Sequence, residues 1–101
     1  MKSERPAIDA SSVASYLNSM ASKVNNGDVI LSFASYGTNS EYNLSSSHAY
    51  SIESIDANNK LVYITNPWFS GGSIAVPYDV FAQAAYSVNN KVYFNVGYVN
   101  A

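Results

Sequence analysis

A lone histidine and one asparagine are the residues of this chain whose types and spacing could do chemistry. His48 is the only histidine and begins the strand-like run His-Ala-Tyr-Ser-Ile. Asn66 ends a second strand-like run and is followed by a proline and the only tryptophan, Trp68. An asparagine carbonyl oxygen that accepts a hydrogen bond from one ring nitrogen fixes the tautomer of a histidine, and the other nitrogen can then exchange a proton with a nucleophile. His48 is therefore a candidate general base, Asn66 its orienting residue, and Trp68 a shield for their bond against water.

The nucleophile that such a base would serve is missing, because the chain contains no cysteine. Ser47 and Ser51 lie close to the histidine in sequence, but no oxyanion partner accompanies them. The absence of cysteine also excludes disulfides and zinc–thiolate sites, and we expect neither a metal site nor a cofactor. The competing interpretation is structural, since a single histidine in a strand more often packs or lies on the surface than catalyses.

Two strand-like runs, over residues 47–55 and 60–65, would position the pair. The residues between them, Asp56-Ala57-Asn58-Asn59, are typical of a turn, so a hairpin is expected. A simple register with Ile55 opposite Lys60 brings Asn66 opposite the residue after His48, and directly opposed residues are about 5 Å apart. Strict alternation then puts His48 and Asn66 on opposite faces, so a bulge or the strand end must turn the asparagine.

The rest of the chain predicts a single domain over residues 9–101, preceded by a flexible lead over residues 1–8. Apolar residues at helical spacing predict a helix over 9–26, with Asp9 as its cap. Strands are expected over 28–34, 73–76 and 91–98, and a short second helix starts at Pro77. This order predicts an α+β fold with a mainly antiparallel sheet, an N-terminal helix and a short helix near the C-terminus.

The run His-Ala-Tyr-Ser-Ile, a turn, and an apolar strand ending in Asn-Pro-Trp resemble the histidine and asparagine motifs of calpain-like cysteine peptidases, in the papain superfamily. Val-Pro-Tyr-Asp-Val-Phe over residues 76–81 resembles the closing segment of that family, and the resemblance covers roughly residues 9–98. It implies a barrel-like antiparallel sheet with peripheral helices. By position it implies His48 as general base, Asn66 as orienting residue and Trp68 beside them. The nucleophilic cysteine of the family belongs to a separate first half.

The resemblance implies the catalytic subdomain of a cysteine endopeptidase that is inactive alone. Its partners would be a missing cysteine-bearing subdomain or chain and, in the complete enzyme, a polypeptide substrate. An apolar patch near His48, Trp68 and Phe69 would then be open, and self-association through this catalytic face is expected. The alternative is a non-catalytic carbohydrate- or protein-binding module, because the nine tyrosines would suit such contacts. Alternatively, those tyrosines pack on the two faces of the sheet.

Charge and composition exclude several classes of partner. A net charge of −2 and the lack of a basic stripe argue against nucleic acid. No apolar run approaches the roughly 18 residues of a membrane span, and no apolar signal core follows the first residues. Localisation is not determined, although a surface rich in Ser and Asn and poor in Lys is common in exported bacterial proteins.

Overall fold

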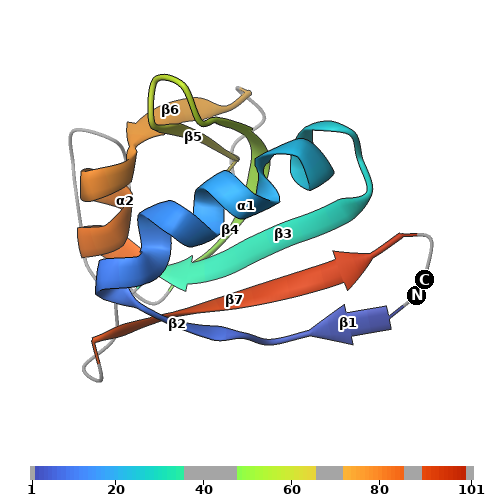
Figure 1. The fold of residues 1–101 in the computed structure, drawn as a ribbon, viewed down its shortest axis with the longest axis horizontal. Helices are drawn as coiled ribbons and strands as arrows, with labels where there is room; N and C mark the ends of the chain where they lie inside the picture. Colours follow the sequence, from blue (N-terminus) through green and yellow to red (C-terminus); the bar gives the residue numbers. More distant parts are fainter. Residues whose placement is uncertain (1, 36–47, 66–71, 86–89, 100–101) are drawn as a thin grey trace.

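In the described part of the chain, an antiparallel sheet carries helices α1 and α2 on one of its faces (Figure 1). The computed structural model spans residues 1–101 and describes residues 2–35, 48–65, 72–85 and 90–99. The elements in chain order are β1 (Lys2–Glu4), β2 (Ala7–Asp9), η1 (Ala10–Ser12), α1 (Val13–Asn25), β3 (Val29–Ser35), β4 (His48–Asp56), β5 (Leu61–Thr65), β6 (Ile74–Pro77), α2 (Tyr78–Ala85) and β7 (Lys91–Tyr98). The strand order is β1-β7-β3-β4-β5-β6, and β2 also pairs with β7. The predicted α+β class, with an N-terminal helix and a short second helix, is confirmed.

The sheet is open, so the expected barrel-like closure is wrong. The path of paired strands runs from β1 to β6, which are its two ends. A barrel closes only when its end strands pair with each other. Here β7, β3, β4 and β5 separate them, and both edges remain in the part of the chain that the structure describes.

A flexible lead was expected over residues 1–8, but strands β1 and β2 lie within residues 2–9. Both pair with β7 in one register, from Lys2 opposite Tyr98 to Asp9 opposite Lys91. Pro6 interrupts this edge strand, yet its carbonyl still accepts a hydrogen bond from the Phe94 N–H at 3.1 Å. The polar composition misled the prediction because an edge strand tolerates charge and proline that a central strand does not.

Helix α1 begins later than its apolar spacing suggested. Asp9 belongs to β2 and makes no capping bond, and its carboxylate instead pairs with Lys91 Nζ at 2.6 Å. A 3-10 turn then leads into α1, whose buried face was predicted correctly. The predicted residues Val13, Leu17, Met20 and Val24 are all buried, and Ala21, which the spacing did not include, is buried with them.

Aromatic side chains join α2 to the centre of the sheet. Phe81 of α2 is fully buried, and its ring lies edge-on to Phe33 of β3 at 4.6 Å and stacked with Phe94 of β7 at 6.1 Å. The Tyr78 hydroxyl donates to Asn18 Oδ1 at 2.9 Å, which ties α2 to α1. The two helices therefore share one core with the central strands β3 and β7.

Candidate functional site

His48 is the first residue of β4 and lies opposite Ser35, the last residue of β3. Only 9% of His48 is exposed, and Ser35 is completely buried. The Ser35 hydroxyl donates to the His48 carbonyl oxygen at 3.2 Å. A buried hydroxyl on the neighbouring strand thus holds the backbone of the candidate base at the end of both strands.

The His48 ring continues a row of aromatic contacts across the core face. It meets Tyr50 edge-on at 4.7 Å, and Tyr50 stacks with Phe33 at 5.6 Å. Phe33 then contacts Phe81, as described above. The candidate base therefore sits at the end of the hydrophobic core, where the core packing limits the orientation of its ring.

A β-bulge at Glu53 decides which face of the sheet His48 occupies. Ile55 lies opposite Val62, but Ile52 lies opposite Ile64, and Glu53 between them has no partner on β5. If the strand alternated regularly without a bulge, the face that buries Ile55 would also bury Glu53, and His48 would turn outward. The bulge therefore puts His48 on the same face as the core residues of β5.

The observed hairpin differs from the simple register expected from the sequence. Ile55 pairs with Val62 rather than Lys60, and Asp56 is the last residue of β4 rather than the first of the turn. Lys60 has a φ of 56°, the left-handed conformation that closes the turn. Within the turn, Asp56 Oδ2 accepts from Asn59 Nδ2 at 2.8 Å and Oδ1 from the Asn59 N–H at 3.1 Å. These hydrogen bonds lower the pKa of the exposed Asp56 carboxyl.

Beyond the bulge, a side chain takes the place of the missing neighbouring strand. The pairing of β3 with β4 ends at Leu31 opposite Ile52. Past that point Asn25, at the end of α1, donates its amide to the Ile55 carbonyl at 2.8 Å and accepts from the Ile55 N–H at 2.9 Å. Asn25 thus anchors α1 to β4. It also gives the N–H and the carbonyl of Ile55 the hydrogen-bond partners that β3 does not supply at this position.

The predicted partners of His48 cannot be placed beside it. Asn66, Trp68 and Phe69 lie outside the described residues, so neither the bond to Asn66 nor the expected apolar patch is tested. The described part of β5 ends at Thr65, which pairs with Ser51. Within that part, β5 buries the side chains of Val62 and Ile64.

The tyrosines that the structure describes lie partly or fully within the molecule. None of them is exposed: Tyr16, Tyr50, Tyr63, Tyr78, Tyr93 and Tyr98 are buried or half-buried. Burial, with smaller effects from the nearby Tyr98 and Glu4, raises the pKa of Tyr16 to about 12. Burial and the Asp56 charge raise the pKa of Tyr78, so its hydroxyl stays a donor to Asn18.

The described ranges contain no group of acidic, histidine or cysteine residues that could hold a metal ion. Neither α1 nor α2, the helices of the described part, combines the length and apolarity needed to cross a membrane. Comparisons with protein-family models, with curated proteins and with solved structures find no match. The family resemblance thus depends on the sequence motifs.

Sequence reasoning missed three residues that position the site. Ser35 lies just beyond the strand expected over 28–34, and only its place after that apolar run hinted at a buried strand end. Glu53 could have been found from spacing, because Tyr50 and Ile52 are two apart whereas Ile52 and Ile55 are three apart. Asn25 carried no local signal, since its partner Ile55 lies far along the chain.

Proposed function

We propose that this chain is the histidine- and asparagine-bearing half of a calpain-like cysteine peptidase core. In this proposal His48 is the general base, Asn66 orients its ring, and Trp68 shields the bond between them. The supporting observation is the bulge at Glu53, because the core-facing residues of β5 and of the start of β4 then share one face. The proposal requires Asn66 to continue the alternation of β5 by one residue, which would turn its side chain to the face that carries His48.

The proton transfer in this proposal divides between the two ring nitrogens. One N–H donates to the Asn66 carbonyl oxygen and the other nitrogen takes the proton of a cysteine thiol supplied by the missing half. A neutral orienting residue suits this step, because the thiolate and the imidazolium already balance each other's charge. The buried Ser35 hydroxyl and the Tyr50 ring support the geometry by restricting the backbone and the ring of His48.

The chain by itself should not hydrolyse peptide bonds. It contains no cysteine, and a histidine without a positioned nucleophile lacks the covalent route. We expect no turnover of unfolded casein by the purified chain. Turnover that disappears in His48→Ala would contradict the proposed role as an incomplete half.

The bond between His48 and Asn66 can be tested without the missing half. In the ¹⁵N-labelled chain, at a pH where the ring is neutral, a single tautomer gives two widely separated ring-nitrogen shifts. We expect Asn66→Ala to bring these shifts together as the tautomers mix. Asn58→Ala is the matched control, because Asn58 is an exposed residue of the turn at the far end of the hairpin. Unchanged ring shifts in Asn66→Ala would overturn the proposed orienting role.

The coding sequence upstream of residue 1 provides the test of the whole core. The proposal expects a segment with a cysteine at the start of a helix, preceded by Gly and Gln. The protein expressed with that segment should cleave unfolded casein, and His48→Ala should abolish the cleavage. Cleavage that survives His48→Ala would remove His48 from the mechanism.

A further inference from the structure

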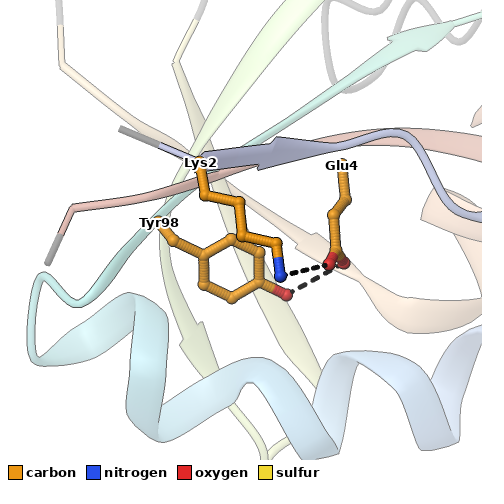
Figure 2. Close-up of polar contacts among 3 residues, drawn as sticks. All are labelled: Lys2, Glu4 and Tyr98. Carbon is orange, nitrogen blue, oxygen red and sulfur yellow. Dashed lines mark hydrogen bonds and ion pairs between the residues drawn. The ribbon is translucent and has the colours of Figure 1, made fainter. Parts of the chain in front are cut away.

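The two edges of the open sheet differ in chemistry. The N-terminal edge is charged and interrupted by Pro6 between β1 and β2. Figure 2 shows the Lys2 ammonium and the Tyr98 hydroxyl both reaching the Glu4 carboxylate, at 3.7 Å and 3.1 Å. Charges and proline are the features with which proteins prevent a sheet edge from pairing with another chain.

The β6 edge lacks these protective features. The segment from Gly72 to Val76 has no charged residue and no proline, and Pro77 comes only at its end. Ile74 is 37% exposed, one of the few large apolar side chains of the described part with that much exposure. No strand of the described part covers the outer side of β6, because β6 ends the path of paired strands.

The backbone groups that β6 presents outward follow from the observed bonds. The Tyr78 N–H donates to the Lys60 carbonyl at 3.0 Å, one step beyond the pair of Leu61 with Pro77. Because bonding alternates along a strand, Val76 and Ile74 also bond to β5. Ala75, Ser73 and Pro77 then direct their backbone groups to the free edge.

The bonds of Ile55 on the other side of the hairpin agree with this assignment. Asn25 holds both the N–H and the carbonyl of Ile55, so these groups point away from β5. Val62, opposite Ile55, must then direct its own groups toward β6. Val62 pairs with Val76 there, which agrees with the assignment made from the Tyr78 hydrogen bond.

We propose that the β6 edge binds β6 of a second copy of this chain, antiparallel about a two-fold axis at Ala75. The two Ala75 residues exchange reciprocal N–H to carbonyl bonds, and each Ser73 N–H donates to the Pro77 carbonyl of the other copy. Pro77 has no backbone N–H, so it is the one outward-facing residue of the edge that donates no hydrogen bond. Ile74 then lies opposite Val76 of the other copy in a non-hydrogen-bonded pair, where side chains approach most closely.

Self-complementarity favours a second copy over an unrelated strand. A two-fold axis at Ala75 satisfies every outward N–H of the edge with a carbonyl of the same short segment. The segment carries no charge, so pairing with itself brings no like charges together. Because β6 is only four residues long, we expect a weak dimer that forms as the concentration rises toward the millimolar range. This inference does not depend on the peptidase proposal.

Sedimentation velocity over a concentration series tests the proposal. The wild-type chain should shift from monomer to dimer. Ala75→Pro should lose the dimer, because proline removes the outward N–H but no bond to β5. Ala75→Ser keeps that N–H and should dimerise as the wild type does. A strictly monomeric wild type, or a dimer that persists in Ala75→Pro, would overturn the proposal, and the latter result would favour another surface.

Disulfide trapping gives a second readout that does not depend on the folding of the proline variant. The chain has no cysteine, so Ala75→Cys introduces the only thiol. Hydrogen-bonded antiparallel partners have Cα atoms about 5.5 Å apart, within the range that a disulfide spans. We expect Ala75→Cys to give a covalent dimer on mild oxidation and Ser3→Cys, on the opposite edge, to stay monomeric. Equal yields from the two variants would overturn the proposal.

Discussion

The turn end and the His48 end of β4 are stabilised by different kinds of contact. At the turn end, polar side chains satisfy the backbone: Asn25 holds Ile55, and Asp56 binds Asn59. At the other end, β3 pairs as far as Ser35, and His48 packs against an aromatic ring. The bulge at Glu53 lies between these two ends of the strand.

This difference shows how a histidine comes to lie on the core face of a strand. The turn end could follow regular alternation, because local hydrogen bonds hold it. The His48 end depends on the bulge, because regular alternation of the same residues from Ile55 would put every side chain before Glu53 on the opposite face. The candidate base therefore owes its position to an irregularity several residues away.

Changing which β4 side chains face the core should have the largest effect on stability. Deleting Ser51 forces a choice between exposing Tyr50 and burying Glu53, so we expect the free energy of unfolding to fall by about 3 kcal/mol or more. Deleting Glu53 instead leaves Ile52 and Ile55 two residues apart on the core face, with an expected cost of about 1 kcal/mol. Urea denaturation of the two deletions measures the contrast. Equal losses would mean that Glu53 is not the inserted residue.

Removing the side-chain bonds at the turn end should have the next largest effect. Asn25→Ala takes both partners from Ile55, and we expect it to lower the free energy of unfolding by about 2 kcal/mol. Amide exchange of Ile55 should accelerate at the same time. Asn26→Ala, at the neighbouring exposed position, is the control. A loss in Asn25→Ala no larger than in the control would show that the turn end does not depend on this amide.

Removing the buried hydroxyl at the His48 end should cost less. Ser35→Ala removes one hydrogen bond to the His48 carbonyl, and we expect a loss of about 1 kcal/mol. The ring resonances of His48 should also shift, because its backbone gains freedom. Ser32→Ala on the same strand is the control. If neither stability nor the His48 resonances respond, the Ser35 hydroxyl does not hold this end.

The smallest effect concerns the Asp56 carboxylate, which is exposed. Its pKa is lowered in the folded protein by the Asn59 bonds, so ionised Asp56 stabilises the fold at neutral pH. That contribution is lost as the pH falls through the folded-state pKa. In thermal unfolding, the wild type should therefore have a higher Tm than Asp56→Asn at neutral pH. The difference between the two Tm values should vanish in acid. A difference that is the same at every pH, or that persists in an Asn59→Ala background, would exclude this linkage.

Most of the fold could be predicted because its signals are local. The face of α1 followed from helical spacing, and the range of β7 from strict alternation of apolar residues. Strand β1 could not be predicted, because Lys2-Ser3-Glu4 lacks any apolar pattern and pairs only because β7 offers an edge. The barrel-like closure failed for a related reason, since which strands pair depends on contacts between distant segments.

The candidate site was predictable in part. His48 was expected in a strand, and it begins β4 on the core face. The simple register would have turned it away from the face that buries Val62 and Ile64, and the bulge puts it on that face. The orientation of Asn66 itself stays a prediction.

The sequence by itself determined the residue types available for chemistry, the lack of a thiol, and the order of helices and strands from α1 to β7. These properties depend on composition and on short-range periodicity. The tertiary structure decided the face of His48, its pairing with Ser35, the anchoring of Ile55 by Asn25, and the chemistry of the two edges. Each of these depends on which distant backbone groups need hydrogen-bond partners, and the chain meets that requirement only when it is folded.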